Sequence, residues 1–208
     1  MARQLEPAFF RRLDEDDDEL FYLTPRFVVH IDHNAIRTVS AIYAAHLPRG
    51  GVLLDLMSSW RSHLPAELNP ARLVGLGLNR AEMEDNPALD EFVVHNLNRA
   101  PRLPFADAAF DGAVLTVSVQ YLVHPVEVFA DVGRVLRPGA PFIVSFSNRM
   151  FPTKAVALWT QATEAQRLAL VSLYFTESAS FERIEMIDRS GGDGDPIWAV
   201  LGYRKEQW

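Results

Sequence analysis

Asp55 follows a short apolar run, Gly51-Val52-Leu53-Leu54, and precedes two serines, Ser58 and Ser59. If the run is a strand of an open parallel sheet, Asp55 lies at its carboxyl end, where such sheets bind ligands. A carboxylate there can bind an ammonium group of a ligand, or it can cap the turn that follows. The two serines predict the cap of a short helix whose free N–H groups face the same cleft.

Other residues offer chemistry, each with a plainer alternative. His124 could serve as a general base, although a histidine at a helix start is more often simply exposed. Arg26 and Arg149 could bind a carboxylate or a phosphate, but surface solvation explains either one alone. His30 and His33 share one face if they lie on a helix, yet no third ligand is evident, so the sequence predicts no metal site.

Composition narrows the class of protein. The chain has 208 residues, of which 49% are hydrophobic, and this fits one folded domain. Its net charge of -7 opposes binding to nucleic acid or to an anionic membrane. The absence of cysteine excludes disulfides, zinc-thiolate sites and a cysteine nucleophile. No signal peptide or membrane-spanning run is recognisable, and we expect a soluble cytoplasmic protein.

The acidity is concentrated in one place. The run Asp14–Glu19 consists of six consecutive acids and holds most of the net charge. Mutual repulsion favours a solvated loop or a fraying helix end there, rather than a site for a metal or a basic partner. The rest of the chain is close to neutral, so the overall charge does not argue against an anionic small molecule.

The elements that would position these residues follow from the apolar pattern. Short apolar runs bounded by turn residues predict strands buried on both faces of a parallel sheet. These runs are Val52–Leu56, Leu73–Leu78, Phe92–Val94, Ala113–Val119 and Phe142–Val144. Helical spacing covers Phe27–Leu47, Pro125–Leu136 and Ala155–Phe175. Phe181–Ile187 and Ile197–Tyr203 predict antiparallel neighbours, which completes a single α/β domain.

Three segments then carry a resemblance to a known family. They are the apolar strand ending in Asp55, the segment LPFADAAFD at Leu103–Asp111, and the segment RVLRPG at Arg134–Gly139. Their order and spacing resemble the class I S-adenosylmethionine-dependent methyltransferases of the small-molecule, type 11-like kind. The resemblance implies a Rossmann-like fold with a mostly parallel seven-stranded sheet, helices on both faces and a C-terminal antiparallel hairpin. It covers a core at 50–208 and leaves 1–49 as an acidic segment and a lid or substrate-facing helix.

The resemblance also implies S-adenosylmethionine as cofactor, although the cofactor loops depart from the family pattern. Met57, Ser59 and Arg61 stand where the first loop usually has glycines. Gly77 stands where an acid usually binds the ribose hydroxyls, so Asn79 is expected to contact one hydroxyl. Asn96 replaces an acid that contacts the adenine amino group, and its side-chain oxygen can accept the same hydrogen bond.

The resemblance places candidate residues at both halves of the site. Those for the cofactor are Asp55, Met57, Ser58, Ser59, Gly77, Leu78, Asn79, Asn96, Leu97, Thr116 and Gln120. Those for the acceptor are Tyr22, Arg26, Tyr121, His124, Asn148 and Arg149. No catalytic residue is assigned, because methyl transfer needs mainly alignment of donor and acceptor.

Two functions from different classes remain open at this stage. The first is methyl transfer to a small-molecule acceptor, without a nucleic-acid or membrane partner. The alternative is a non-catalytic binding or regulatory protein on the same fold, because Met57 or Trp60 could fill the cofactor cavity. A dinucleotide-binding oxidoreductase ranks last, since the chain has no G-x-G-x-x-G motif.

Overall fold

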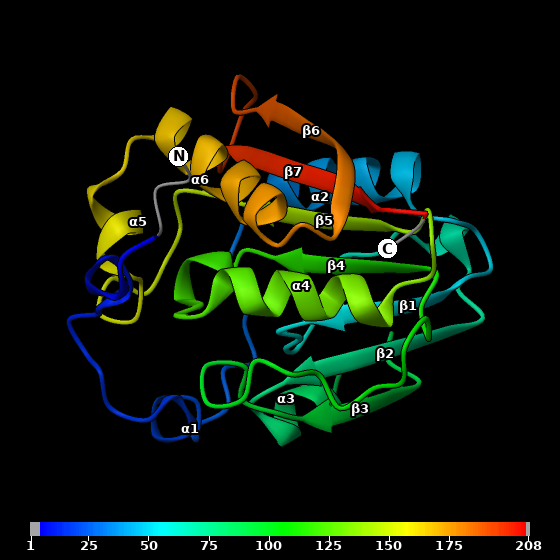
Figure 1. Ribbon diagram of the computed structural model, residues 1–208. Coiled ribbons are helices and arrows are strands. Elements are labelled where there is room, and N and C mark those ends of the chain that lie inside the picture. The colour runs from blue at the N-terminus through cyan, green and yellow to red at the C-terminus, as the bar shows by residue number, and fades with distance from the viewer. Residues whose placement is uncertain (1–4, 207–208) are drawn as a thin grey trace.

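A seven-stranded sheet organises the computed structural model, which describes residues 5–206 (Figure 1). Its strands are β1 (Val52–Leu56), β2 (Arg72–Gly77), β3 (Glu91–Val94), β4 (Gly112–Thr116), β5 (Pro141–Phe146), β6 (Phe181–Arg189) and β7 (Ile197–Arg204). Their spatial order is β3-β2-β1-β4-β5-β7-β6. Strands β1 to β5 run parallel, whereas β7 is antiparallel to both β5 and β6. The predicted mostly parallel sheet with a C-terminal hairpin is confirmed.

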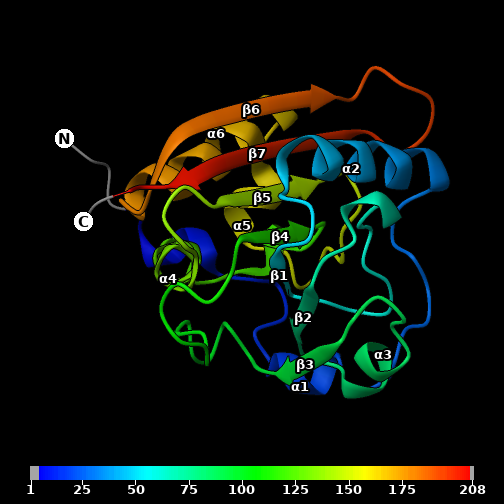
Figure 2. The same ribbon diagram turned by 90° about the vertical axis from the view of Figure 1, so that its right-hand side faces the viewer.

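Helices cover both faces of this sheet (Figure 2). α2 (His33–His46) and α3 (Arg80–Glu84) lie on one face, while α4 (Pro125–Val135), α5 (Ala157–Gln161) and α6 (Glu164–Glu177) lie on the other. The remaining short elements are α1 (Asp18–Phe21) and the 3-10 turns η1 (Pro7–Phe10), η2 (Ala66–Leu68) and η3 (Val119–Tyr121). Within residues 5–206, no helix is long and apolar enough to cross a membrane.

The sheet is buried on both faces, which is why its strands read as continuous apolar runs. On one face Tyr43 of α2 packs in a cluster with Leu53 and Ile143. On the other face, the rings of Phe129 and Phe175 contact that of Phe142 at centroid distances of 5.0 and 5.4 Å. Helix α2 therefore belongs to the core, and only residues 5–32 of the predicted N-terminal lid lie elsewhere.

Two predicted helices differ from those observed, because side-chain caps interrupt the apolar pattern. The helix expected over Phe27–Leu47 begins at His33, after the side chain of Asp32 accepts a hydrogen bond from the backbone N–H of Ala35. The helix expected over Ala155–Phe175 is two helices, since Thr163 forms a capping box that starts α6 afresh.

One predicted strand is also shorter than expected. The apolar run Ala113–Val119 leaves the sheet after Thr116, where Val117 takes a left-handed φ of 52°. The chain then forms the turn η3. An apolar run cannot reveal this exit, because Val117 and Val119 satisfy a strand pattern equally well.

The N-terminal segment, residues 5–32, runs past the carboxyl ends of the parallel strands, where the arrowheads of β2, β3 and β4 point (Figure 1). Most of its acid run is solvated, as expected, because Glu15, Asp16, Asp17 and Glu19 are exposed. Asp18 is the exception. Asp18 is 5% exposed, and its carboxylate lies 2.6 Å from Arg12 and 3.5 Å from the ammonium of Lys154. Lys154 is itself fully buried and also pairs with Asp14 at 3.1 Å. Repulsion within the run is relieved by these two cations.

Candidate functional site

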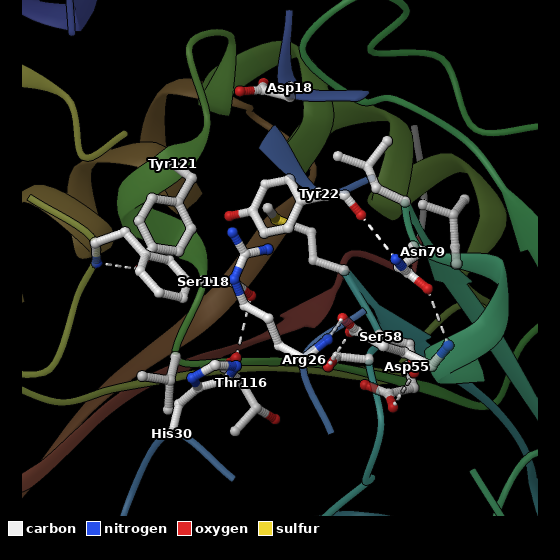
Figure 3. A pocket seen from close by; sticks show the side chains of 18 of the residues that line it. Asp18, Tyr22, Arg26, His30, Asp55, Ser58, Asn79, Thr116, Ser118 and Tyr121 are labelled. Carbon is white, nitrogen blue, oxygen red and sulfur yellow. Dashed lines mark hydrogen bonds between the residues drawn. The ribbon is translucent and has the colours of Figure 1, made fainter. Parts of the chain in front are cut away.

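A cavity of about 460 Å³ opens where the N-terminal segment crosses the ends of the parallel strands (Figure 3). This volume lies within the range of about 300–1,000 Å³ that is typical of small-molecule sites. All the cofactor candidates except Gln120 line it, and so do all the acceptor candidates except His124. The topology thus gathers residues from five strand ends and from the N-terminal segment around one space.

Asp55 is the buried carboxylate of this cavity, with 5% exposure at the end of β1. Its Oδ2 accepts hydrogen bonds from Ser58 Oγ at 2.7 Å and from Ser62 Oγ. Burial raises the pKa of Asp55 from 3.8 to about 6, although the two hydroxyls oppose the shift. At neutral pH the site therefore holds a desolvated negative charge, which suits a cationic group on a ligand.

The first loop keeps a glycine-like path without its glycines. Met57 adopts a left-handed φ of 55° at the position where the family pattern has its first glycine. The backbone N–H of Ser58 donates to Leu76 O at 2.8 Å, which brings the loop against β2. A Cβ on Gly77 would lie 2.1 Å from the backbone oxygen of Ser58. Gly77 thus has no side chain because the loop occupies that space.

The short helix predicted after the two serines is wrong. Residues 57–65 form no helix, and η2 begins only at Ala66. The serine hydroxyls donate to carboxylates instead, Ser58 to Asp55 and Ser59 to Glu82 at 2.8 Å. From sequence alone, the nearby backbone N–H groups are the expected partners of the two serines. Glu82 lies far from Ser59 in sequence, so the local pattern does not reveal this pairing.

Trp60 lies outside the cavity lining. Its indole N–H donates to Asp85 Oδ2 at 2.6 Å, and its ring meets that of Phe27 edge-on at 6.1 Å. The guanidinium of Arg61 lies 3.8 Å from the indole centroid. Of the two side chains that could have filled the cofactor space, only Met57 reaches it.

Asn79 holds the N-terminal segment and caps a helix at the same time. Its side-chain nitrogen donates to Tyr22 O at 2.7 Å, and its oxygen accepts from the backbone N–H of Glu82 at the start of α3. Both polar groups are thus in use, so the expected contact of Asn79 with a ribose hydroxyl would compete with them.

Glu82 is the residue that sequence reasoning missed. It is 5% exposed, lines the cavity, and accepts hydrogen bonds from Arg26 N at 2.6 Å and from Ser59 Oγ. This carboxylate joins the N-terminal segment to the first loop. The sequence signal that could have found Glu82 is its position three residues after Asn79, which caps α3. Acids are favoured in the first turn of a helix.

At the end of β3, Asn96 and Leu97 both line the cavity. The side-chain oxygen of Asn96 accepts from the backbone N–H groups of Asn98 at 3.0 Å and Arg99 at 3.3 Å. These bonds form a local turn and occupy the oxygen that the sequence assigned to an adenine amino group. Leu97 is buried and gives this end of the cavity an apolar wall.

On the opposite side of the cavity, aromatic rings surround the guanidinium of Arg26. Figure 3 shows this side chain extending from the Asp55 end of the cavity toward Tyr22 and Tyr121. The ring of Phe151 stacks on that of Tyr121 at 6.0 Å with an interplanar angle of 29°. Burial raises the pKa of Tyr22 and of Tyr121, so both phenols are protonated at neutral pH and can donate hydrogen bonds.

Two imidazoles, those of His30 and His63, also line the cavity. Burial lowers the pKa of His30, and it lowers that of His63 to about 4. Both rings are therefore neutral at physiological pH and can accept a proton. His63 was not a sequence candidate, because it follows the loop rather than a strand.

The remaining sequence candidates lie deeper or nearer the surface than expected. Gln120 is buried outside the lining, where its Nε2 donates to Val117 O at 2.9 Å. His124 lies in a separate surface hollow and pairs with Glu127 at 3.2 Å, so a general-base role is not supported by its position. Arg149 reaches the lining but is 62% exposed and lies 3.9 Å from the carboxylate of Asp195. Asn148 lines the cavity and is exposed.

The pair His30 and His33 is divided between two environments. His30 lines the cavity in the N-terminal segment, whereas His33 begins α2 and is absent from the lining. Among the described residues 5–206, no group of three or more histidine or acidic side chains is placed to hold a metal ion.

Comparison with known proteins finds a domain match and relatives that cover part of the chain. Residues 62–144 match the family described as "Methyltransferase domain". The chain is 31% identical over 91 residues to the ubiquinone/menaquinone biosynthesis C-methyltransferase UbiE of Bartonella quintana, which is 42% of this chain and 34% of that protein. It is 33% identical over 69 residues to the biotin biosynthesis bifunctional protein BioHC of Teredinibacter turnerae, which is 33% of this chain and 12% of that one. The matched parts are thus about a third or less of these relatives.

Solved structures share the fold at low sequence identity. A Thermotoga maritima protein described as a SAM-dependent methyltransferase, possibly a histamine N-methyltransferase, aligns with a TM-score of 0.59 and 14% identity over 82% of this chain and 90% of that one. A Haloferax volcanii complex of the Trm112 activator with a putative methyltransferase gives a TM-score of 0.63 and 14% identity over 84% and 91% of the two chains. Residues 62–144 thus match a methyltransferase domain, and the chain as a whole has the fold of these methyltransferase structures.

Proposed function

We propose that this protein transfers a methyl group from S-adenosylmethionine to a small-molecule acceptor. The observation that carries the proposal is the single cavity that joins the carboxyl ends of β1 to β5 and is lined by nearly all the residues expected from the family pattern. The matched relatives are named for ubiquinone/menaquinone and biotin biosynthesis, which supports a small-molecule acceptor.

The residues of the cavity fit the chemical groups of this cofactor. The carboxylate of Asp55 suits the ammonium of the methionine moiety, and the apolar wall at Leu97 suits the adenine ring. Glu82 offers the carboxylate near the end of β2 that Gly77 cannot carry, so we assign the ribose hydroxyls to it. Trp60 is turned away, which leaves this space open.

The chain's own part in the reaction is to orient, desolvate and accept a proton. When bound, S-adenosylmethionine supplies an electrophilic methyl group on its sulfonium. The N-terminal segment forms one side of the cavity and would limit the access of water, while the rings of Tyr22 and Tyr121 would restrict how an acceptor can lie. If the acceptor atom carries a proton, the neutral imidazole of His30 is available to take it.

Calorimetric titration with S-adenosylhomocysteine, the demethylated cofactor, tests the proposal. We expect saturable binding to the unchanged protein, and binding at least about tenfold weaker to Asp55→Asn, because a neutral amide replaces a charged partner of the ammonium. Glu67→Gln serves as the matched control, since Glu67 is exposed in η2 and absent from the cavity lining.

No heat of binding at millimolar S-adenosylhomocysteine would refute cofactor use and leave a non-catalytic role on this fold. Equal affinities of the unchanged protein and Asp55→Asn would instead remove Asp55 from the cofactor site.

A further inference from the structure

The guanidinium of Arg26 has an unused donor inside the cavity. Its Nη2 donates to Phe21 O at 3.0 Å, whereas Nη1 is buried and has no hydrogen-bond partner among the described residues. The carboxylate of Glu82 binds the backbone N–H of Arg26 rather than its guanidinium. A buried donor of a charged group is costly to leave unpaired, so Nη1 is placed to bind an anionic group of a ligand.

Aromatic rings enclose this donor. The central carbon of the guanidinium lies 4.5 Å from the ring centroid of Phe21, 5.3 Å from that of Phe151 and 5.5 Å from that of Tyr22. Tyr22, Tyr121 and Phe151 also line the cavity, and we call these three residues the aromatic wall. Flat faces beside a buried cation suit a flat ligand that carries its charge at one edge.

The charges around the cavity select the kind of anion. Asp18, Asp55 and Glu82 line the same space, and their negative field opposes a doubly charged phosphate. A carboxylate carries one charge and is planar, which matches the planar edge of a guanidinium. Arg149, the other arginine considered for the acceptor, is mostly in solvent and lies near Asp195, so its charge is already screened and partly compensated.

We propose that the acceptor side of the cavity binds a small planar carboxylic acid, with the carboxylate on Arg26 Nη1 and the flat part of the molecule against the aromatic wall. This inference rests on the proposed function, because it describes the acceptor of that reaction. The sequence left open which arginine binds the acceptor and whether the bound group is a carboxylate or a phosphate. The proposal assigns the role to Arg26 and the group to a carboxylate.

The test compares acids with amides of the same shape. Benzoate and trans-cinnamate, with benzamide and trans-cinnamamide as neutral counterparts, are titrated into the protein by ligand-observed NMR, with and without S-adenosylhomocysteine. We expect each acid to bind about ten- to a hundredfold more tightly than its amide, because only the acid forms a charge-assisted hydrogen bond with the buried donor. Arg26→Gln should abolish this preference, and Arg72→Gln should keep it, because Arg72 lies exposed at the start of β2, outside the cavity lining.

A second variant separates the wall from the charge. Phe151→Leu should weaken acid and amide by a similar factor and leave their ratio unchanged, which also keeps the test valid if Arg26→Gln folds poorly. Equal binding of acid and amide to the unchanged protein overturns the inference, and so does a preference that survives in Arg26→Gln.

The cofactor titration keeps the two proposals distinguishable. Binding of S-adenosylhomocysteine without any preference for acids leaves the proposed function standing and refutes this inference alone. A preference for acids without S-adenosylhomocysteine binding supports the anion site and refutes the proposed function.

Discussion

Replacing Asp55 by asparagine should stabilise the protein at neutral pH while it weakens cofactor binding. The folded state holds this carboxyl buried, and its pKa of about 6 lies above the ordinary value of 3.8. The folded protein therefore binds more protons than the unfolded chain between these values, and its free energy of unfolding falls as pH rises through that window. The amide of the Asp55→Asn variant would keep an acceptor for Ser58 and Ser62 without a charge that titrates.

The magnitude follows from the two pKa values. A rise from 3.8 to about 6 corresponds to about 3 kcal/mol for the fully charged form, at about 1.4 kcal/mol for each pKa unit. At about pH 4.5 part of this destabilisation is already present, because the carboxyl of the unfolded chain is mostly charged there. The stability difference between the two proteins should therefore grow by about 2 kcal/mol between about pH 4.5 and pH 7.5. The exposure of Asp55 is 5%, so screening by solvent reduces this figure little.

Urea denaturation of both proteins, followed by tryptophan fluorescence at several pH values, measures this difference. We expect Asp55→Asn to be more stable than the unchanged protein at pH 7.5, with a gap that narrows steadily toward pH 4.5. Parallel stability profiles across this range would refute the reasoning, as would an Asp55→Asn variant that is less stable at pH 7.5.

Two further substitutions test how the cavity is built. Gly77→Ala should lower the free energy of unfolding by about 1–3 kcal/mol and weaken S-adenosylhomocysteine binding, because the new Cβ would displace the backbone oxygen of Ser58. The control is Gly191→Ala, which should change neither quantity, because a Cβ at Gly191 would have no atom within 4 Å. Lys154→Met should cost about 3 kcal/mol and speed proteolysis within residues 5–32, since half-buried Asp14 loses its cation and buried Asp18 keeps only Arg12. Arg80→Met, which removes an exposed ion pair, should cost less than about 1 kcal/mol. Urea titrations, calorimetry and timed digestion check these outcomes, and a Lys154→Met protein as stable and as protease-resistant as Arg80→Met would contradict the second.

A buried charge that destabilises the fold calls for a functional reason. Stability alone would favour a neutral residue at position 55, since two hydroxyls are the only side-chain hydrogen bonds to the carboxylate among the described residues. Binding a cationic ligand group would recover the desolvation energy of the charge. The proposed contact with the methionine ammonium supplies this reason, and the two Asp55→Asn measurements, of stability and of affinity, should change in opposite directions.

The sheet was predictable because the information is local. A strand buried on both faces reads as an apolar run, and a polar residue at or just after its end lies at the edge where such sheets bind ligands. Asp55 and Asn96 occupy such positions, and both line the cavity. The family pattern then orders the strands. Helix ends were harder to predict, because the cap at Thr163 interrupts an apolar pattern that continues across it.

Side-chain partners could not be predicted in the same way. Glu82 bonds with Arg26 and Ser59, which are 56 and 23 residues away in sequence. Lys154 bonds with the backbone oxygen of Asp16, 138 residues away. Such pairings depend on how the N-terminal segment crosses the sheet edge, and no periodicity records that path. For the same reason the local pattern does not reveal that Asp18 is buried within the acid run, or that the side chain of Asn79 is already hydrogen-bonded.

The most direct test of the central claim is a crystal structure of the protein with S-adenosylhomocysteine. The account predicts the ligand in the cavity at the ends of β1 to β4, with its ammonium at Asp55, its ribose hydroxyls at Glu82 and its adenine beside Leu97, while Trp60 remains against Phe27. Density for the ligand at another place, or Trp60 turned into the cavity so that no nucleoside fits, would contradict it.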